Sequence, residues 1–480
     1  MKNKYNPYEI PITKPEKPLR ILFLTDSLGE EVKNNNSIIS KLHKLSEFDE
    51  LEIWFSPTQD PDLQKLTSNI VTGNSCEYTL IKGKYPHKRF IASLHMDYGE
   101  RQYSTLLREF PDSKSSPNLF ETVKGSRINI MELDIIYRID DTFYNWDLLD
   151  LVVAHKDDLE TASLAGKFHV VCLDDVMERI RLFMLNHRLF YVEKWFNTCE
   201  ISYYAHRRLK LFPNMKQLWS IINTHAENSE WVQSLYTRTE LYLRAIDKLK
   251  INSLRQPNNI VATQYEYDFA FLILLVTGIF DNLAWLICKI YEIELGKMDI
   301  KLIIPNEEKK RKFIKAVEEK CSCLSDFLSM EITQAKIGLV YPIRDTVVHR
   351  DYLTTVRYMD AQKKIDAVYL KVSPEISQKF GKLTDLGMNL SHCFQHDKIG
   401  KSTVTDKATG KTDVYGASED MYIIPYAFID MIDDMVSGLI NSMTDIIVTS
   451  KNGGITSDNP TGILNFLEKK LTHCIFNLYV

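Results

Sequence analysis

The residue types best suited to chemistry in this chain lie close together, between Arg344 and His349. Arg344 is a permanent cation that can hold a phosphate, and His349 can give or take a proton near neutral pH. Asp345 lies about one helical turn before His349, so its carboxylate can orient the imidazole. These residue types at this spacing favour chemistry on a phosphate ester.

Two features predict that this stretch lies in the opening turns of a helix. Pro342 suits a first helical turn, and the segment 343–352 contains neither glycine nor proline. On such a helix Arg344, Val347 and Val348 share one stripe. A guanidinium on an apolar face is costly to bury alone, so Arg344 needs an anionic partner or an open cleft.

The stretch resembles the R-x4-H motif of HEPN-domain ribonucleases, with Arg344 and His349 at its ends and a polar residue after the arginine. In that family the ribose 2′-hydroxyl attacks the adjacent phosphate, which leaves a 2′,3′-cyclic phosphate and a 5′-hydroxyl without a metal or other cofactor. The resemblance implies that His349 moves the proton, that Arg344 stabilises charge on the phosphate and that Asp345 orients one or both. The alternative interpretation is a structural Arg344–Asp345 pair beside a surface histidine.

The spacing of the motif also bears on the oligomeric state. Arg344 and His349 lie about 140° apart around an ideal helix, at ~100° per residue, so one helix presents them poorly to a single phosphate. Two such helices across a two-fold axis bring both pairs into one cleft. We therefore expect a homodimer or a higher homo-oligomer. The resemblance further implies single-stranded RNA as the substrate and a role as a regulated toxic effector in prokaryotic antiviral defence.

Three further polar residues are candidates for RNA binding. Asp281 and Asn282 interrupt an apolar helix, so they need polar partners, either in the same cleft or within the bundle. Arg350 directly follows His349, and it can hold the RNA backbone or be solvated. For Asp281 and Asn282 a structural hydrogen bond within the bundle is the more common role, and for Arg350 neither role is favoured.

The N-terminal part of the sequence predicts an α/β domain. Apolar strands and helical segments alternate, which is typical of a mostly parallel, Rossmann-like sheet. The expected strands are 20–25, 51–55, 148–154 and 169–173, with further strands at 76–82 and 90–94. A turn at 26–29 and a helix through Ile38 to Leu45 follow the first strand. Asp26 and Ser27 at its end occupy the position where α/β folds bind ligands, or they cap a helix.

The apolar spacing becomes helical from residue 176 onward. The expected helices are 176–195, 203–211, 231–249, 265–295, 306–328, 342–358 and 426–448, with a connector at 213–224, a shorter helical piece at 331–340, strands at 367–372 and 421–424, and a polar loop at 398–418. The chain is thus expected to be an α+β multi-domain protein. Its expected parts are an α/β sensor domain at 1–175, a helical connector at 176–224, a HEPN-like helical bundle with a small β insertion at 225–450, and a tail at 451–480. An activating ligand or protein is expected at the sensor domain.

Composition limits which other classes of protein this chain can belong to. The net charge of −5 gives no overall attraction to nucleic acid, so an RNA site has to be a local basic patch. The eight cysteines are scattered and the first residues do not resemble a signal peptide, which predicts a reducing cytoplasm. The longest apolar run, 269–280, is shorter than a membrane span. No metal site and no cofactor are expected.

Two rival functions remain. The segment Thr25-Asp26-Ser27-Leu28 resembles the first block of GDSL-type esterases, in which this serine is the nucleophile. Threonine stands here in place of the family's glycine, and the D-x-x-H block of the family is missing, so His155 is the nearest candidate base. The second rival is a non-catalytic, antitoxin-like binding protein with a HEPN fold.

Overall fold

The computed structural model of this chain describes most of the residues between 18 and 451. The described residues are 18–46, 48–58, 60–70, 74–82, 90–98, 101–107, 127–128, 150–159, 162, 169–193, 196–197, 200–222, 229–254, 259–304, 311–349, 355–360, 365–390, 393–395, 402–405, 412–415 and 421–451. They belong to two compact units that divide between Glu200 and Ile201, inside the segment 176–224 that was expected to be a connector. Of the expected tail, residues 452–480 lie outside the described residues.

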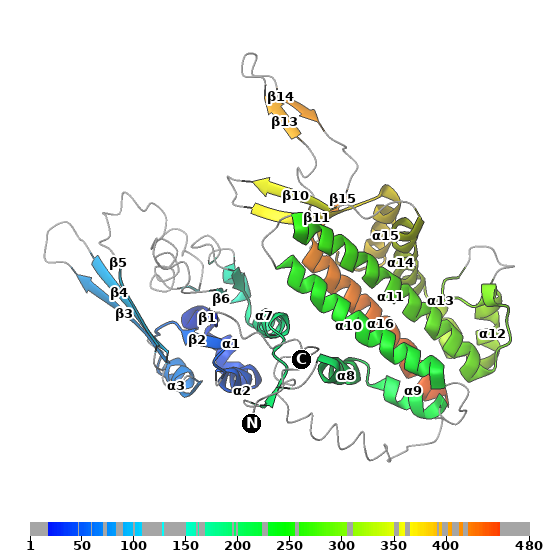
Figure 1. Ribbon diagram of the computed structural model, residues 1–480, viewed down its shortest axis with the longest axis horizontal. Helices are drawn as coiled ribbons and strands as arrows, with labels where there is room; N and C mark the ends of the chain where they lie inside the picture. Colours follow the sequence, from blue (N-terminus) through cyan, green and yellow to red (C-terminus); the bar gives the residue numbers. More distant parts are fainter. Residues whose placement is uncertain are drawn as a thin grey trace, which may run out of the picture. The chain divides into compact units, whose positions relative to one another are not determined.

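A small parallel sheet forms the centre of the N-terminal unit (Figure 1). Its strands lie in the order β2-β1-β6-β7, with bounds β1 (Leu19–Phe23), β2 (Leu51–Phe55), β6 (Leu151–Val153) and β7 (His169–Val171). Ile21 of β1 pairs with Ile53 of β2 on one side and with Leu151 of β6 on the other. These three residues are buried, which explains why the strands appear in the sequence as continuous apolar runs. The four strands expected for a parallel sheet are confirmed.

The helices of this unit depart from expectation at two points. Their bounds are α1 (Thr25–Asn34), α2 (Asn36–Leu45), α3 (Pro61–Ile70) and α7 (Leu173–Asn186). The expected turn at 26–29 is wrong, because α1 begins at Thr25 and bends within itself at Gly29, whose φ is +34°. The expected helix to Trp195 is also too long, because Arg188 adopts a left-handed φ of 57° that ends α7.

Antiparallel strands complete the described part of the unit. They are β3 (Asn74–Lys82), β4 (Phe90–Tyr98) and β5 (Arg101–Leu107), followed later by β8 (Tyr191–Glu193) and β9 (Phe196–Asn197). The strands expected at 76–82 and 90–94 are present, whereas β5 and the β8–β9 pair were not expected. A 3-10 turn, η1 (Lys156–Asp158), follows β6.

The second unit is a helical bundle. Its helices are α8 (Glu200–Leu211), α9 (Asn214–Ile222), α10 (Ser229–Ser253), α11 (Asn259–Tyr291), α12 (Lys312–Lys320), α13 (Ser322–Ser329), α14 (Glu331–His349), α15 (Pro374–Asp385) and α16 (Pro425–Lys451). The long helices α10, α11 and α16 lie side by side (Figure 1). Aromatic rings join them, with the Phe269 and Phe428 centroids 5.5 Å apart and Phe380 of α15 next to Phe428.

Helix α11 is the core helix of this bundle. By length and composition it could cross a membrane, but 72% of its most apolar window is buried inside the structure. A buried core helix of a globular protein passes the same composition test, so this feature is weak evidence for a membrane span.

Some bundle elements differ from the expected ones. The expected connector at 213–224 contains α9, and the expected helix 306–328 is two helices, α12 and α13, separated by an extended Cys321. Helix α15 was not expected. A small antiparallel sheet in the order β10-β11-β15-β12 supplies the expected β insertion, with bounds β10 (Thr355–Asp360), β11 (Ile365–Val372), β12 (Phe394–Gln395) and β15 (Met421–Ile423). The expected loop 398–418 contains the hairpin β13 (Ser402–Thr405) and β14 (Thr412–Tyr415).

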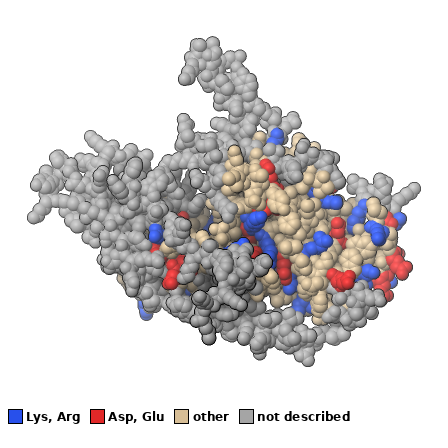
Figure 2. Space-filling model, in the orientation of Figure 1, with Lys and Arg blue, Asp and Glu red and all other residues tan. Residues whose placement is uncertain are grey.

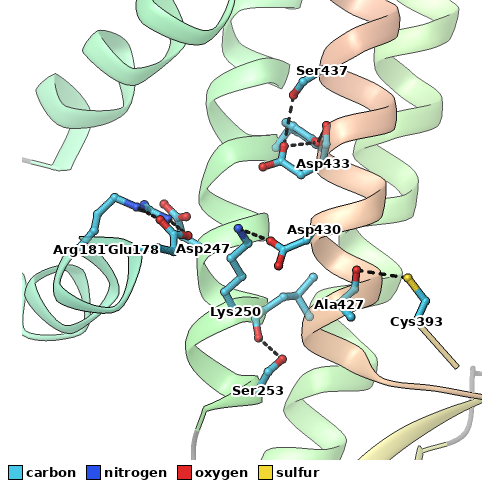
Figure 3. A network of polar contacts seen from close by, with 12 residues as sticks. Glu178, Arg181, Asp247, Lys250, Ser253, Cys393, Ala427, Asp430, Asp433 and Ser437 are labelled. Atoms are coloured by element: carbon cyan, nitrogen blue, oxygen red, sulfur yellow. Dashed lines mark hydrogen bonds and ion pairs between the residues drawn. The ribbon is translucent and has the colours of Figure 1, made fainter. Parts of the chain in front are cut away.

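Polar contacts tie the long helices together across the bundle (Figure 3). The Lys250 ammonium of α10 lies 2.6 Å from a carboxylate oxygen of Asp430 on α16. One turn further along α16, Asp433 accepts hydrogen bonds from Ser437 and from the Tyr242 hydroxyl, the latter at 2.7 Å. Lys250 and Tyr242 are buried, so these contacts supply partners for polar groups that have left water.

A buried ion pair between α8 and α10 gives the first testable prediction. Arg207 donates to Asp247, which also accepts from the Tyr204 hydroxyl at 3.1 Å, and Asp247 is 1% exposed. Asp247→Ala removes the carboxylate from a buried guanidinium, so it should lower the free energy of unfolding by about 3–5 kcal/mol. Guanidinium denaturation measures this loss. Asp445→Ala, at an exposed acid of α16, is the control and should change stability by less than about 0.5 kcal/mol; an equal effect of both substitutions would refute the assignment.

Candidate functional site

The Arg344–His349 stretch lies at the C-terminal end of α14, and not in its opening turns as expected. The expected helix start at Pro342 is wrong, because α14 begins at Glu331 and continues through the proline. Pro342 lacks the N–H that would bond to the Gly338 carbonyl, so the helix loses one hydrogen bond there. Packing explains why the helix nevertheless continues: Ile337, Val340 and Ile343 are all buried.

Arg344 lies one turn beyond Val340, near the end of α14, where the helix face becomes accessible. Its side chain is 39% exposed, and among the described residues its one ion pair is with Asp345, at 3.8 Å. Asp345 is itself 54% exposed. An exposed pair at this distance contributes little stability and holds neither side chain firmly. The guanidinium is therefore available to bind an anion.

Asp281 of α11 lies next to this arginine through Tyr341. The Tyr341 hydroxyl donates a hydrogen bond to Asp281 at 3.3 Å. Burial and the Asp281 carboxylate both raise the pKa of Tyr341, whereas the Arg344 charge acts in the opposite direction. The three groups are therefore neighbours, and the tyrosine stays protonated as a donor to the acid. The sequence signal for Tyr341 is its position three residues before Arg344, on the same helical face.

Asn282 does not share this position. It is 5% exposed, and its side-chain oxygen has no hydrogen-bond partner among the described residues. Asp281 is exposed on the same helix. The structure thus brings one of the two expected polar residues to Arg344 and places the other inside the bundle.

The histidine of the motif is described only in its backbone. His349 is the last residue of α14, and its side chain lies outside the described part of the structure. Arg350, a candidate for contact with the RNA backbone, lies wholly outside the described residues.

An apolar stripe on α11 remains uncovered beside this site. Tyr267, Phe271 and Leu274 are 66%, 41% and 43% exposed, and their spacing of four and three residues puts them on one face of the helix. Large side chains of this kind are normally buried, and a contiguous exposed set marks an interaction surface. We call these three residues the α11 stripe.

The α11 stripe and Arg344 belong to one face of the bundle. Tyr341 contacts Asp281, while Thr355, just beyond α14, donates its backbone N–H to Glu266 at 2.7 Å. Later residues of the α14 segment thus contact earlier residues of α11, so the two helices are antiparallel. Val348, 44% exposed and one turn past Arg344, then lies level with the stripe.

Charges on the described surface are mixed rather than segregated. Figure 2 shows basic and acidic side chains interleaved on the visible face, between broad areas of uncharged residues. This distribution agrees with the net charge of −5. Attraction of a polyanion to the described surface thus depends on single cations such as Arg344.

Ser27, the candidate nucleophile of the rival esterase hypothesis, takes part in structural hydrogen bonds. Ser27 is 0% exposed, donates to Asp158 at 2.7 Å and accepts from the backbone N–H of His155 at 3.1 Å. The His155 imidazole instead accepts from the backbone N–H of Asp157 at 3.2 Å. A nucleophilic serine must be reachable and must donate to a base. Ser27 meets neither condition. Its hydrogen bonds instead hold the segment after β1 against the segment after β6.

The neighbouring residues act in the same way. Thr25 donates its backbone N–H and its hydroxyl to Ser56, both at 2.7 Å, and Asp26 accepts from Thr58. Neither Asp26 nor Ser27 caps α1, whose N-cap is Leu24 without a side-chain bond. These polar residues therefore join β1 to β2 at the carboxyl ends of the strands.

No protein-family model, no curated protein and no solved structure matches this chain. Within the described ranges, no three His, Cys, Asp or Glu side chains gather as metal ligands. The function must therefore be inferred from the geometry of the chain's own residues.

The Ser27 network makes a second prediction. A serine-reactive fluorophosphonate should leave the folded chain unmodified, because Ser27 is buried and its proton is held by Asp158. Intact-mass spectrometry of the incubated protein measures this, with an active serine hydrolase in the same tube as a reagent control. An adduct that maps to Ser27 would restore the esterase hypothesis.

Proposed function

We propose that this chain is a metal-independent endoribonuclease of the HEPN type that cleaves single-stranded RNA. The observation that carries the proposal is Arg344, a cation that is 39% exposed on a bundle helix, with a weak partner and an apolar stripe beside it. A permanent cation with the rigid fork geometry of a guanidinium suits recognition of a phosphodiester.

The proposed reaction needs two proton transfers and charge stabilisation. The ribose 2′-hydroxyl loses its proton to the imidazole of His349 and attacks the adjacent phosphorus. The bond to the 5′-oxygen then breaks, and that oxygen takes up a proton, which leaves a 2′,3′-cyclic phosphate and a 5′-hydroxyl. Arg344 stabilises the extra negative charge on the phosphate as it develops. Asp345, exposed beside Arg344, orients the cation or the imidazole.

A second copy of the chain completes the proposed site. One α14 presents Arg344 and His349 about 140° apart around an ideal helix, so two helices are needed to surround one phosphate. The α11 stripe and Val348 offer the apolar surface on which a two-fold partner would pack. Pairing along this face places both Arg344 side chains near the symmetry axis.

The N-terminal unit supports a regulatory role in this proposal. Its strand order β2-β1-β6-β7 extends first to one side of β1 and then to the other, as in Rossmann-like sheets. Such sheets bind ligands beyond the carboxyl ends of the strands at this reversal. The N-terminal unit would restrain a nuclease that is otherwise toxic to its own cell until an activating ligand or protein binds there.

The third prediction concerns catalysis. In buffer with EDTA, the wild type should cleave mixed single-stranded RNA, and Arg344→Ala or His349→Ala should each lower the rate by about 100-fold or more, as loss of a proton-transfer or charge-stabilising group does. Gel analysis of the products and phosphatase sensitivity of their 3′ ends measure the rate and the chemistry.

The matched control for this assay is Lys336→Ala, which removes a cation from α14 about two turns before Arg344 and should leave the rate within about 2-fold. RNA that stays intact with wild-type protein under every activating condition would reject the nuclease. A dimer that binds RNA without cutting it would instead identify the non-catalytic binding protein.

The fourth prediction concerns the α11 stripe. Leu274→Asp places a charge in the proposed dimer contact, so the particle mass measured by light scattering should fall from twice the chain mass to the chain mass. Met298→Asp is the control, because Met298 is an exposed apolar residue of η3 (Lys297–Asp299), off the stripe. A wild-type chain that is monomeric at all concentrations would contradict the two-fold site.

A further inference from the structure

Two cysteines meet at the start of α13, at a place unrelated to the proposed nuclease site. Cys321 is the extended residue between α12 and α13, with φ −155° and ψ 90°, and Cys323 is in the first turn of α13. Their sulfur atoms are 3.3 Å apart. Cys321 is 7% exposed, whereas Cys323 is exposed to solvent.

Three helices supply the surroundings of the Cys321 sulfur. Tyr291 at the end of α11 and Ser450 near the end of α16 share a hydrogen bond, and both hydroxyls lie close enough to Cys321 to lower the pKa of its thiol. The backbone N–H of Leu324, in the first turn of α13, also points to the sulfur. The Lys451 ammonium lies over the Tyr291 ring, 4.8 Å from its centroid.

These contacts give the two cysteine thiols different pKa values. Burial by itself raises the pKa of Cys321, but the hydrogen bonds from Tyr291 and Cys323 outweigh it and lower the pKa below its ordinary value. The hydrogen bond to Cys321 raises the pKa of Cys323. Cys321 is therefore the better thiolate, and Cys323 is a neighbouring thiol that keeps its proton.

We propose that Cys321 and Cys323 form a reversible dithiol–disulfide site that takes hydroperoxides as its oxidant. The Cys321 thiolate attacks one peroxide oxygen and breaks the O–O bond, which gives a sulfenic acid and hydroxide (or an alcoholate). The Cys323 sulfur then attacks the Cys321 sulfur and expels the oxygen, which leaves as water with the Cys323 proton. In total, two thiols and one hydroperoxide give one disulfide, one water and one water or alcohol.

The geometry favours this pair over the other described cysteines. The sulfurs need to approach by only about 1.2 Å to reach a disulfide length of about 2.05 Å. Burial raises the pKa of both Cys288 and Cys393 to about 11, so these thiols are poor nucleophiles. A disulfide between residues only two apart is strained, and strained, exposed disulfides are the readily reduced ones.

Oxidation would also change a contact that holds the bundle together. The disulfide draws the Cys321 sulfur toward Cys323 and away from Tyr291 and Ser450. The ends of α11 and α16 then lose their shared partner in the α12–α13 connection. The site thus couples oxidation to the packing of this end of the bundle.

The test is a peroxide titration of the reduced full-length chain, followed by alkylation, digestion and mass spectrometry. The peptide with both cysteines should lose its two alkylation sites and become two hydrogen atoms lighter. This should occur at a peroxide concentration at least about 10-fold below that which modifies Cys393, and dithiothreitol should restore both sites. In Cys323→Ser, an exposed position where folding is preserved, the reaction should stop at a sulfenic acid that dimedone traps on Cys321.

Tyr291→Phe tests the positioning role of the tyrosine. The midpoint of the pH profile for alkylation of Cys321 should move to higher pH, because a hydrogen bond to the thiolate is lost. The proposal is overturned if Cys321 and Cys323 react no faster than Cys393, or if peroxide converts them to sulfinic acids without a disulfide. An unchanged alkylation profile in Tyr291→Phe would also overturn the assigned thiolate.

Discussion

The organisation of the bundle depends on the unequal burial of the apolar helix α11. Most of this helix is enclosed by the bundle, and Leu272, Val276, Ile279 and Leu283 are fully buried. Burial of each such side chain contributes about 1.5–3 kcal/mol, so the packed face fixes the rotation of the helix. The same rotation leaves Tyr267, Phe271 and Leu274 in water. The α11 stripe is thus a direct consequence of how the core packs.

The rotation of α11 also fixes where the motif helix presents its cation. Helix α14 buries Ile337, Val340 and Ile343, and its contact between Tyr341 and Asp281 joins its accessible face to that of α11. Arg344 then lies on the same side as the stripe. A half-exposed guanidinium beside an uncovered apolar surface is the arrangement expected for a site that a second copy would complete.

The sequence predicts the parallel strands and the long helices well, because burial on both faces or on one stripe leaves a clear apolar pattern. The end of α7 could not be predicted in this way, since apolar spacing continues through Phe190 while Arg188 adopts a left-handed backbone. At Pro342, by contrast, the sequence predicted a helix boundary that the structure does not have. Its local preference is for a first turn, but core packing on both sides of it keeps α14 continuous.

The candidate site was predictable only where residue type alone is informative. Arg344, Asp345 and Asp281 could be selected because charged residues in apolar segments need partners. The α11 stripe could not, because a helix that is apolar on all sides does not mark which face stays uncovered. Ser27 illustrates the same limit: its role is decided by Asp158, 131 residues away in the sequence.

The most direct test of the central claim is a structure of the protein bound to single-stranded RNA with 2′-deoxy sugars, which the proposed reaction cannot cleave. The proposed arrangement predicts two copies packed along their α11 stripes, with the Arg344 guanidiniums of both copies about 3 Å from the oxygens of one phosphate. RNA bound to a single copy, or to a surface remote from Arg344 while the stripes stay exposed to solvent, would contradict it.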